Sequence, residues 1–220
     1  MVALPSPPVL ALLAGRVRAF PRPAAEPSAI AKVPLSGRVA ITRLGLAGDE
    51  QADSLHHGGV DKAIHHYPFD HYPLWREEIG AHPLLAAPGG FGENVSTLGM
   101  TEETVRLGDR YRLGSALIEV SHGRQPCWKI AHHFDRADLT KRVVATGRAG
   151  WYYRVIEEGA AEAGDTLVLV EQGLGAWPLA RLFDVLVSGK DAVAAADLRA
   201  LAANPVLAEA WRMRARQMLG

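Results

Sequence analysis

The sequence predicts a mixed β and α fold, in which a β-barrel core with flanking helices is followed by a helical unit. Short runs of alternating apolar residues, separated by glycine and proline, continue to about residue 173 and are typical of antiparallel strands. No glycine-rich dinucleotide or phosphate-loop pattern favours a doubly wound sheet instead. From Pro178 onward apolar residues recur at helical spacing. We therefore expect a flexible lead over residues 1–13, a barrel domain over 14–173 and a three-helix unit over 174–220.

Short extended segments and one helix make up the expected first half of the barrel. The predicted strands there cover residues 15–20, 29–35, 38–42 and 63–67. Residues 70–80 predict a short helix, with Pro73 in its first turn, where a missing N–H is tolerated.

A hairpin opens the second half, with strands over residues 109–113 and 116–120 joined by Gly114 and Ser115. Later strands are expected within residues 150–159 and 165–172, and helices over 128–134 and 139–145. The C-terminal helices, broken at Gly189 and Pro205, are too short to form a core alone, so they should pack on the barrel or on another subunit. Their expected core residues are Leu182, Val185, Leu186, Leu198, Leu201, Leu207 and Trp211.

Composition excludes several classes of protein. A hydrophobic content of 48% argues against disorder, and the 24 basic and 24 acidic residues cancel, so no net field attracts nucleic acid. The apolar run over residues 9–13 is too short to span a bilayer, and no basic residue precedes it as in a signal peptide. A single cysteine fits a reducing compartment. We expect a cytoplasmic protein with no membrane or nucleic-acid partner.

Cys127 is the only cysteine and follows a predicted strand. Pro126 interrupts the strand just before it, and a helical segment follows. Arg124 and Lys129 are cations that would stabilise a thiolate near the start of that helix. The sequence therefore predicts a nucleophile or a soft-metal ligand, with a small buried hydrophobic residue as the alternative.

Five of the nine histidines fall in one window, and they raise the question of a zinc site: His56, His57, His65, His66 and His71. Neighbours on a strand point to opposite faces, so at most one of each adjacent pair should face a common pocket. Zinc also prefers a closed set of nitrogen and sulfur ligands. We expect most of these histidines to form hydrogen bonds beside a pocket instead of holding zinc.

The glycine pair Gly58 and Gly59 could present backbone N–H groups to an anion, with Lys62 close enough to contact a phosphate. Asp61 and Asn94 add the acceptor and amide groups that can bind the edge of a fused heterocycle. Each residue also has a structural alternative: Asp61 could cap a turn, and Asn94 could occupy a turn position with left-handed backbone.

Four motifs in order strengthen the functional alternative: GLAGDEQ, HHGGVDKAIHHYP, FGENVSTLG and LGDRYRLGSALIEVSHGRQPCWKI. Together they resemble the MOSC family, the domain shared by molybdenum cofactor sulfurases and related proteins, and in particular its YiiM-like branch. The resemblance covers nearly the whole chain, including the C-terminal helices. It implies a β-barrel fold with a cleft for the molybdenum cofactor, molybdopterin.

The resemblance also implies roles for individual residues. Cys127 would ligate molybdenum directly, as suits a soft thiolate ligand. The glycine turn and the Glu93–Asn94 loop would border the cofactor, and Arg124 could bind its phosphate. We nominate His57 or His65 as proton donor and Tyr67 as a wall for the substrate. The implied cofactor-binding residues are His57, Gly58, Gly59, Asp61, Lys62, Asn94, Arg124 and Cys127.

The activity implied is reduction of N-hydroxylated bases such as 6-hydroxylaminopurine. A separate reductase or flavoprotein would supply electrons, because the sequence shows no nicotinamide or flavin site; pyridoxal phosphate is not expected either. One alternative is a carrier of cofactor or sulfur that uses a Cys127 persulfide, and another is a cysteine hydrolase with a Cys127–histidine dyad. The apolar stripes of the helical tail predict a homodimer.

Overall fold

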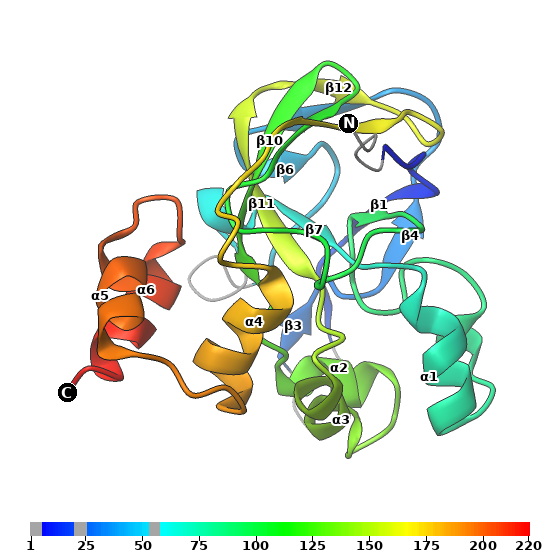
Figure 1. Ribbon diagram of the computed structural model, residues 1–220. Coiled ribbons are helices and arrows are strands. Elements are labelled where there is room, and N and C mark those ends of the chain that lie inside the picture. Colours follow the sequence, from blue (N-terminus) through cyan, green and yellow to red (C-terminus); the bar gives the residue numbers. More distant parts are fainter. Residues whose placement is uncertain (1–5, 20–25, 53–57) are drawn as a thin grey trace.

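The computed structural model describes residues 6–19, 26–52 and 58–220. In this part of the chain a long curled β-sheet forms a half-barrel, with helices gathered at one end and on one side (Figure 1). The strands are β1 (Ala11–Gly15), β2 (Arg18–Ala19), β3 (Pro27–Ser28), β4 (Lys32–Pro34), β5 (Val39–Thr42), β6 (Gly45–Leu46), β7 (Ile64–His66), β8 (Val95–Ser96), β9 (Arg110–Leu113), β10 (Ala116–Gly123), β11 (Trp151–Glu157), β12 (Gly159–Ala161) and β13 (Leu167–Glu171).

Eight of the strands in the described residues form the curled sheet, in the order β13-β9-β10-β11-β7-β8-β1-β4. Its pairs are antiparallel except for β7 and β8, which run parallel. A smaller sheet has the order β12-β5-β6, and β2 pairs with β3. The two ends of the curl approach each other, because Pro8 and Thr166 form an antiparallel bridge. The mixed fold and barrel-like core expected from the sequence are therefore confirmed.

Residues 9–13 belong to the core, whereas the sequence predicted a flexible lead over residues 1–13, of which 1–5 lie outside the described part. Val9 is buried and its N–H donates to the carbonyl of Asp165 at 2.9 Å. All five residues of β1 are buried, because neighbouring strands pair with both of its edges and side chains cover both faces. The apolar run of residues 9–13 is thus strand, not lead.

The helices of the described residues are α1 (His71–Ile79), α2 (Trp128–His133), α3 (Leu139–Thr146), α4 (Leu179–Phe183), α5 (Ala195–Ala203) and α6 (Glu209–Gln217). Single 3-10 turns cover Val60–Lys62 and Pro83–Leu85, and α4 continues into a π-helical turn at Asp184–Ser188. No helix in the described ranges is long and apolar enough to cross a bilayer. The helices expected near 70–80, 128–134 and 139–145 are confirmed.

The C-terminal helices pack on the barrel. All seven residues predicted as their core are buried. The ring of Trp211 lies over Gly123 at the end of β10, so closely that a Cβ on that glycine would stand 3.1 Å from it. The N–H of Ala208 donates to the carbonyl of Ser121 at 3.1 Å. The helical unit therefore supports the strand that leads to Cys127.

Candidate functional site

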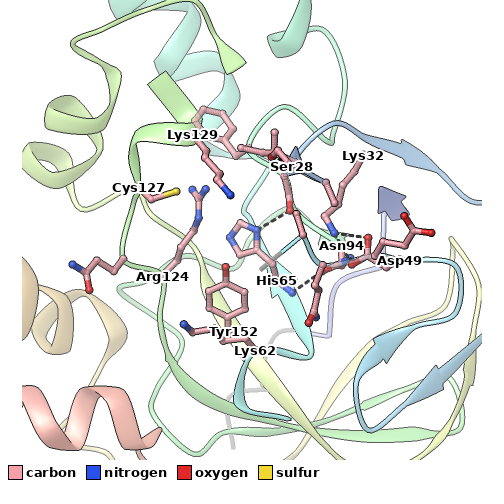
Figure 2. A pocket seen from close by; sticks show the side chains of 18 residues that line it. Ser28, Lys32, Asp49, Lys62, His65, Asn94, Arg124, Cys127, Lys129 and Tyr152 are labelled. Carbon is pink, nitrogen blue, oxygen red and sulfur yellow. Dashed lines mark hydrogen bonds and ion pairs between the residues drawn. The ribbon is translucent and has the colours of Figure 1, made fainter. Parts of the chain in front are cut away.

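A pocket of about 700 Å³, including the solvent at its mouth, opens beside the end of β10 (Figure 2). Segments far apart in sequence form it, and polar side chains dominate. The lining residues are Ser28, Ala29, Ile30, Lys32, Asp49, Glu50, Gln51, Ala52, Lys62, His65, Phe91, Gly92, Asn94, Arg124, Gln125, Cys127, Lys129 and Tyr152.

Cys127 lies in the loop between β10 and α2, as the N-cap residue of that short helix. Its side chain is partly exposed and lines the pocket. The Thr140 hydroxyl donates to its carbonyl at 3.3 Å, which ties the loop to α3. The end of β10 and the start of α2 lie on either side of Cys127, as predicted from the sequence. A thiol facing a polar pocket is not the buried hydrophobic residue of the alternative reading.

Arg124 is nearly buried on the same wall, with 6% of its surface exposed. Its Nη1 atom is buried and meets no hydrogen-bond acceptor among the described residues. A buried donor left in this way costs free energy, so it indicates a place for a ligand acceptor. Three lysines also line the pocket, and among the described lining residues they and Arg124 give four cations against two carboxylates. The pocket is suited to an anion.

The two carboxylates of the pocket are already bound by the protein. Asp49 forms an ion pair with Lys32 at 2.6 Å and accepts from the N–H of Gly15 at 2.7 Å. Burial lowers the pKa of Lys32, and the neighbouring Asp49 opposes that shift. Glu50 accepts from Arg16 and from the N–H of Val17, both at 2.7 Å. Neither carboxylate is available to neutralise Arg124.

His65 extends from β7 into the pocket. Its Nδ1 atom lies 3.2 Å from the Gly92 carbonyl, which can only accept, so Nδ1 carries the proton. Its Nε2 atom is buried without a hydrogen-bond partner in the described part of the chain. Burial, reinforced by the charge of Arg124, holds the pKa of His65 well below its usual value. His65 is thus neutral and presents a lone pair, which is an acceptor rather than the proton donor we predicted.

Tyr152, which sequence reasoning missed, lines the pocket opposite His65. The two residues pair across β7 and β11, with ring centroids 5.0 Å apart. Gly150 permits this pairing, because at its φ of 75° a Cβ would stand 2.3 Å from the carbonyl oxygen of His66. The only signal was the strand pattern at residues 150–159, which does not say whether Tyr152 or Tyr153 faces the pocket.

Asn94 positions other pocket residues instead of offering its amide to a ligand. Its Oδ1 accepts from the N–H of His65 at 3.0 Å. Its Nδ2 donates to the Leu13 carbonyl at 3.1 Å and to Asp49 at 2.8 Å. The neighbouring Glu93 is buried and accepts from backbone N–H groups of its own loop. The predicted reading of a heterocycle edge by Asn94 therefore lacks the donors it needs.

Several other predicted residues lie away from the pocket. Asp61 pairs with Arg154 at 2.9 Å, and neither Gly58 nor Gly59 lines the pocket. Tyr67 is fully buried and stacks on Phe91, so it does not form the predicted substrate wall. Its hydroxyl donates to the Arg148 carbonyl at 3.1 Å. His57 lies outside the described residues. Lys62, His65, Asn94, Arg124 and Cys127 do meet in one pocket.

The histidine window does not form a zinc site in the described residues. His66 points away from His65, as strand geometry predicts, and its ring nitrogens lie 3.0 Å from the Tyr153 and Thr97 hydroxyls. His71 pairs with Glu102 at 2.7 Å. No three histidine, cysteine or acidic side chains within the described ranges cluster as metal ligands.

Comparisons with known proteins place this chain among proteins of one family. The model of the MOSC domain matches residues 53–168. Protein YiiM of Escherichia coli is 45% identical over 158 residues, covering 72% of this chain and 70% of that protein. A protein named "Reductase" from Gibberella moniliformis is 42% identical over 175 residues, 79% of this chain but 31% of its own length. The crystal structure of YiiM from Geobacillus stearothermophilus superposes with a TM-score of 0.81 at 34% identity, covering 97% of this chain and all of that one.

Proposed function

Because the chain belongs to the MOSC domain family, we propose that it binds a molybdenum cofactor through Cys127 and reduces N-hydroxylated bases such as 6-hydroxylaminopurine. One observation carries the proposal: a partly exposed thiol shares a pocket with a buried arginine whose Nη1 atom meets no acceptor in the described part of the chain. That combination suits a ligand that carries both a soft metal and an anionic group.

The residues of the pocket fit a pterin cofactor with a phosphate. Arg124 offers a planar donor fork, and Lys62 and Lys129 add positive charge to the same lining. A phosphate would accept from the Nη1 atom of Arg124, which meets no acceptor in the described part of the chain. The thiolate of Cys127 would hold molybdenum. When bound, the cofactor supplies two-electron oxidation and reduction.

The protein itself contributes orientation and hydrogen bonds. Asn94 fixes the backbone of His65, and the Gly92 carbonyl fixes the tautomer of its ring. Lys32 and Asp49 neutralise each other on the opposite wall, so their charge does not compete with Arg124 for an anion. A substrate that reaches Cys127 therefore meets one fixed acceptor and a predominantly positive surface.

We further propose a separate electron-donating reductase or flavoprotein as partner. The fungal relative named "Reductase" supports this, because the similar segment is only 31% of its length and the remainder could carry a function that this chain obtains from another protein. We also propose a cytoplasmic homodimer. Exposed apolar side chains on and after α6, at Met213, Met218 and Leu219, support the dimer. A monomeric mass in light scattering at micromolar concentration would refute it.

The decisive assay measures turnover. Protein made in a host that synthesises the molybdenum cofactor is incubated with 6-hydroxylaminopurine and a chemical reductant, and adenine is quantified. We expect molybdenum-dependent formation of adenine. Protein that retains molybdenum without turnover would favour the carrier alternative, in which Cys127 holds cofactor or sulfur. Alkylation of Cys127 that abolishes hydrolysis by a metal-free protein would favour the hydrolase.

A further inference from the structure

His65 and Tyr152 lie directly opposite each other on β7 and β11, so both side chains project from the same face of the sheet. Their rings are tilted by 34° with centroids 5.0 Å apart, and both line the pocket. Figure 2 shows the Tyr152 hydroxyl directed toward the region between His65 and Arg124. The pair therefore presents two polar groups to one place in the pocket.

The two groups have opposite hydrogen-bonding roles. His65 Nδ1 donates to Gly92, which leaves Nε2 as a buried acceptor without a partner among the described residues. Burial raises the pKa of Tyr152, so its hydroxyl keeps its proton at neutral pH. The positive charge of Arg124 opposes that shift. The protonated hydroxyl of Tyr152 can therefore donate to a ligand in the pocket.

The Tyr152 ring is held from behind. His122 of β10 stacks on it at 5.2 Å, with 22° between the planes. The register between β10 and β11 shifts between Val120 and His122, so that His122 is the cross-strand partner of Tyr152. Trp211 of α6 packs edge-on against His122, with ring centroids 5.6 Å apart. A ring packed in this way can hold a proton at a fixed position.

The geometry points to Tyr152 as the catalytic acid for an N-hydroxylated substrate, and to His65 Nε2 as the acceptor that orients the hydroxyl of that substrate. This assignment rests on the proposed function and replaces His65 as proton donor. Reduction of R–NH–OH to R–NH2 and water consumes two electrons and two protons. The N–O bond breaks, and Tyr152 gives its proton to the departing hydroxyl, which leaves as water. Two electrons come from an external reductant, and solvent supplies the proton on nitrogen.

The phenolate left on Tyr152 lies beside Arg124, whose charge stabilises it until solvent returns the proton. The same pair of groups also predicts specificity. An N-hydroxyl group can donate to His65 and accept from Tyr152, whereas an N-oxide can only accept and would leave His65 Nε2 unpaired. Discrimination of this kind is large when a buried polar atom loses its partner.

The first test compares Tyr152→Phe with Tyr153→Phe, the same change one residue later on the opposite face of β11. The hydroxyl of Tyr153 forms a hydrogen bond with the Nδ1 atom of His66, away from the pocket. In molybdenum-loaded protein with dithionite, we expect Tyr152→Phe to lower kcat about 100-fold or more, as for loss of a general acid. Its molybdenum content should equal that of the parent. Calorimetric binding of the N-hydroxylated purine without reductant should weaken by no more than about tenfold, as for one lost hydrogen bond. Tyr153→Phe should keep the parental kcat.

The second test uses His65→Phe, which removes the acceptor, and His65→Gln, which restores one. We compare equilibrium binding of an N-hydroxylated purine with that of the N-oxide of the same ring. His65→Phe should weaken the first about tenfold and leave the second unchanged, and His65→Gln should recover part of the loss. Equal effects on both ligands would overturn the orienting role.

Failure of this inference differs from failure of the proposed function. If the parent protein reduces N-hydroxylated purines and Tyr152→Phe does so at a rate within twofold of it, Tyr152 is not the acid. If Tyr152→Phe loses molybdenum, the phenol serves the cofactor, and the assignment is also overturned. A parent protein that holds no molybdenum or turns over no substrate removes the proposed function itself.

Discussion

Trp211 of α6 packs edge-on against His122 of β10, and His122 in turn stacks on Tyr152 in the pocket. The C-terminal helices thus reach the candidate site through two ring contacts. Burial lowers the pKa of His122 well below its usual value, so this imidazole is neutral and packs as an aromatic ring. The helical unit therefore has a structural role at the site in addition to any role in assembly.

Trp211→Ala should destabilise the protein by about 3–5 kcal/mol, the usual cost of removing a buried tryptophan. The cavity would open over Gly123 and beside His122. Urea unfolding followed by circular dichroism measures the change. Met213→Ala is the control, because Met213 lies on the exposed side of the same helix and its removal should change stability by less than about 0.5 kcal/mol. Equal effects of the two variants would contradict the packing described.

Asn94→Ala should destabilise the protein by about 2–4 kcal/mol, because it leaves the His65 N–H and the Leu13 carbonyl without their side-chain partner. We also expect His65 to lose its fixed position, so binding at the pocket should weaken. Chemical unfolding and ligand calorimetry measure the two effects separately. Asn204→Ala, in the turn before α6, is the matched control. It should leave ligand binding unchanged.

Stability should fall as pH drops below 6.5. Burial lowers the pKa of His66 to about 3 and that of His133 to about 4, against an ordinary value of 6.5. The unfolded chain therefore binds more protons than the folded one between these values, and the free energy of unfolding decreases as pH falls through this range. For His66 alone the loss at pH 5 is about 2 kcal/mol. His66→Gln should make the pH dependence of unfolding shallower, and an unchanged slope would contradict the assignment.

Arg124→Gln should lower the cofactor content of the protein without lowering its stability. The change removes a buried cation whose Nη1 meets no acceptor within the described ranges, so the cofactor-free protein should be as stable as the parent or more so. Molybdenum and pterin content should nevertheless fall at least tenfold. Arg142→Gln, on the exposed face of α3, should change neither quantity appreciably. An Arg124 variant with parental pterin content would show that this arginine does not bind the cofactor.

Much of the fold could be predicted from local patterns. The hairpin of β9 and β10, the strands β11 and β13 and the position of Cys127 between a strand and a helix follow from alternation and turn residues. Strands of two or three residues, such as β6, β8 and β12, carry too short a pattern to detect. The prediction of a flexible lead was wrong at residues 11–13, because a strand that is buried on both faces does not alternate apolar and polar residues.

Only part of the site could be predicted, because some of its residues come together only in the folded structure. Cys127 and Arg124 lie near each other in sequence, but Lys32 and Asp49 join them only through the sheet. Tyr152 and Tyr153 are adjacent on one strand, and only the register with β7 shows which faces the pocket. Tyr67 was misassigned because it follows the last residue of β7 and turns toward Trp75, which donates to its hydroxyl at 2.6 Å. Tertiary placement, not local propensity, decides these cases.

Elemental analysis for molybdenum, paired with pterin fluorescence, tests the central claim most directly. The parent protein and Cys127→Ser are purified from the same cofactor-competent host, with thermal unfolding to show that both are folded. The parent should hold about one molybdenum per chain, and the variant should hold almost none, because a hydroxyl is a poor ligand for a soft metal. Equal molybdenum in the two proteins, or none in the parent, would contradict the account.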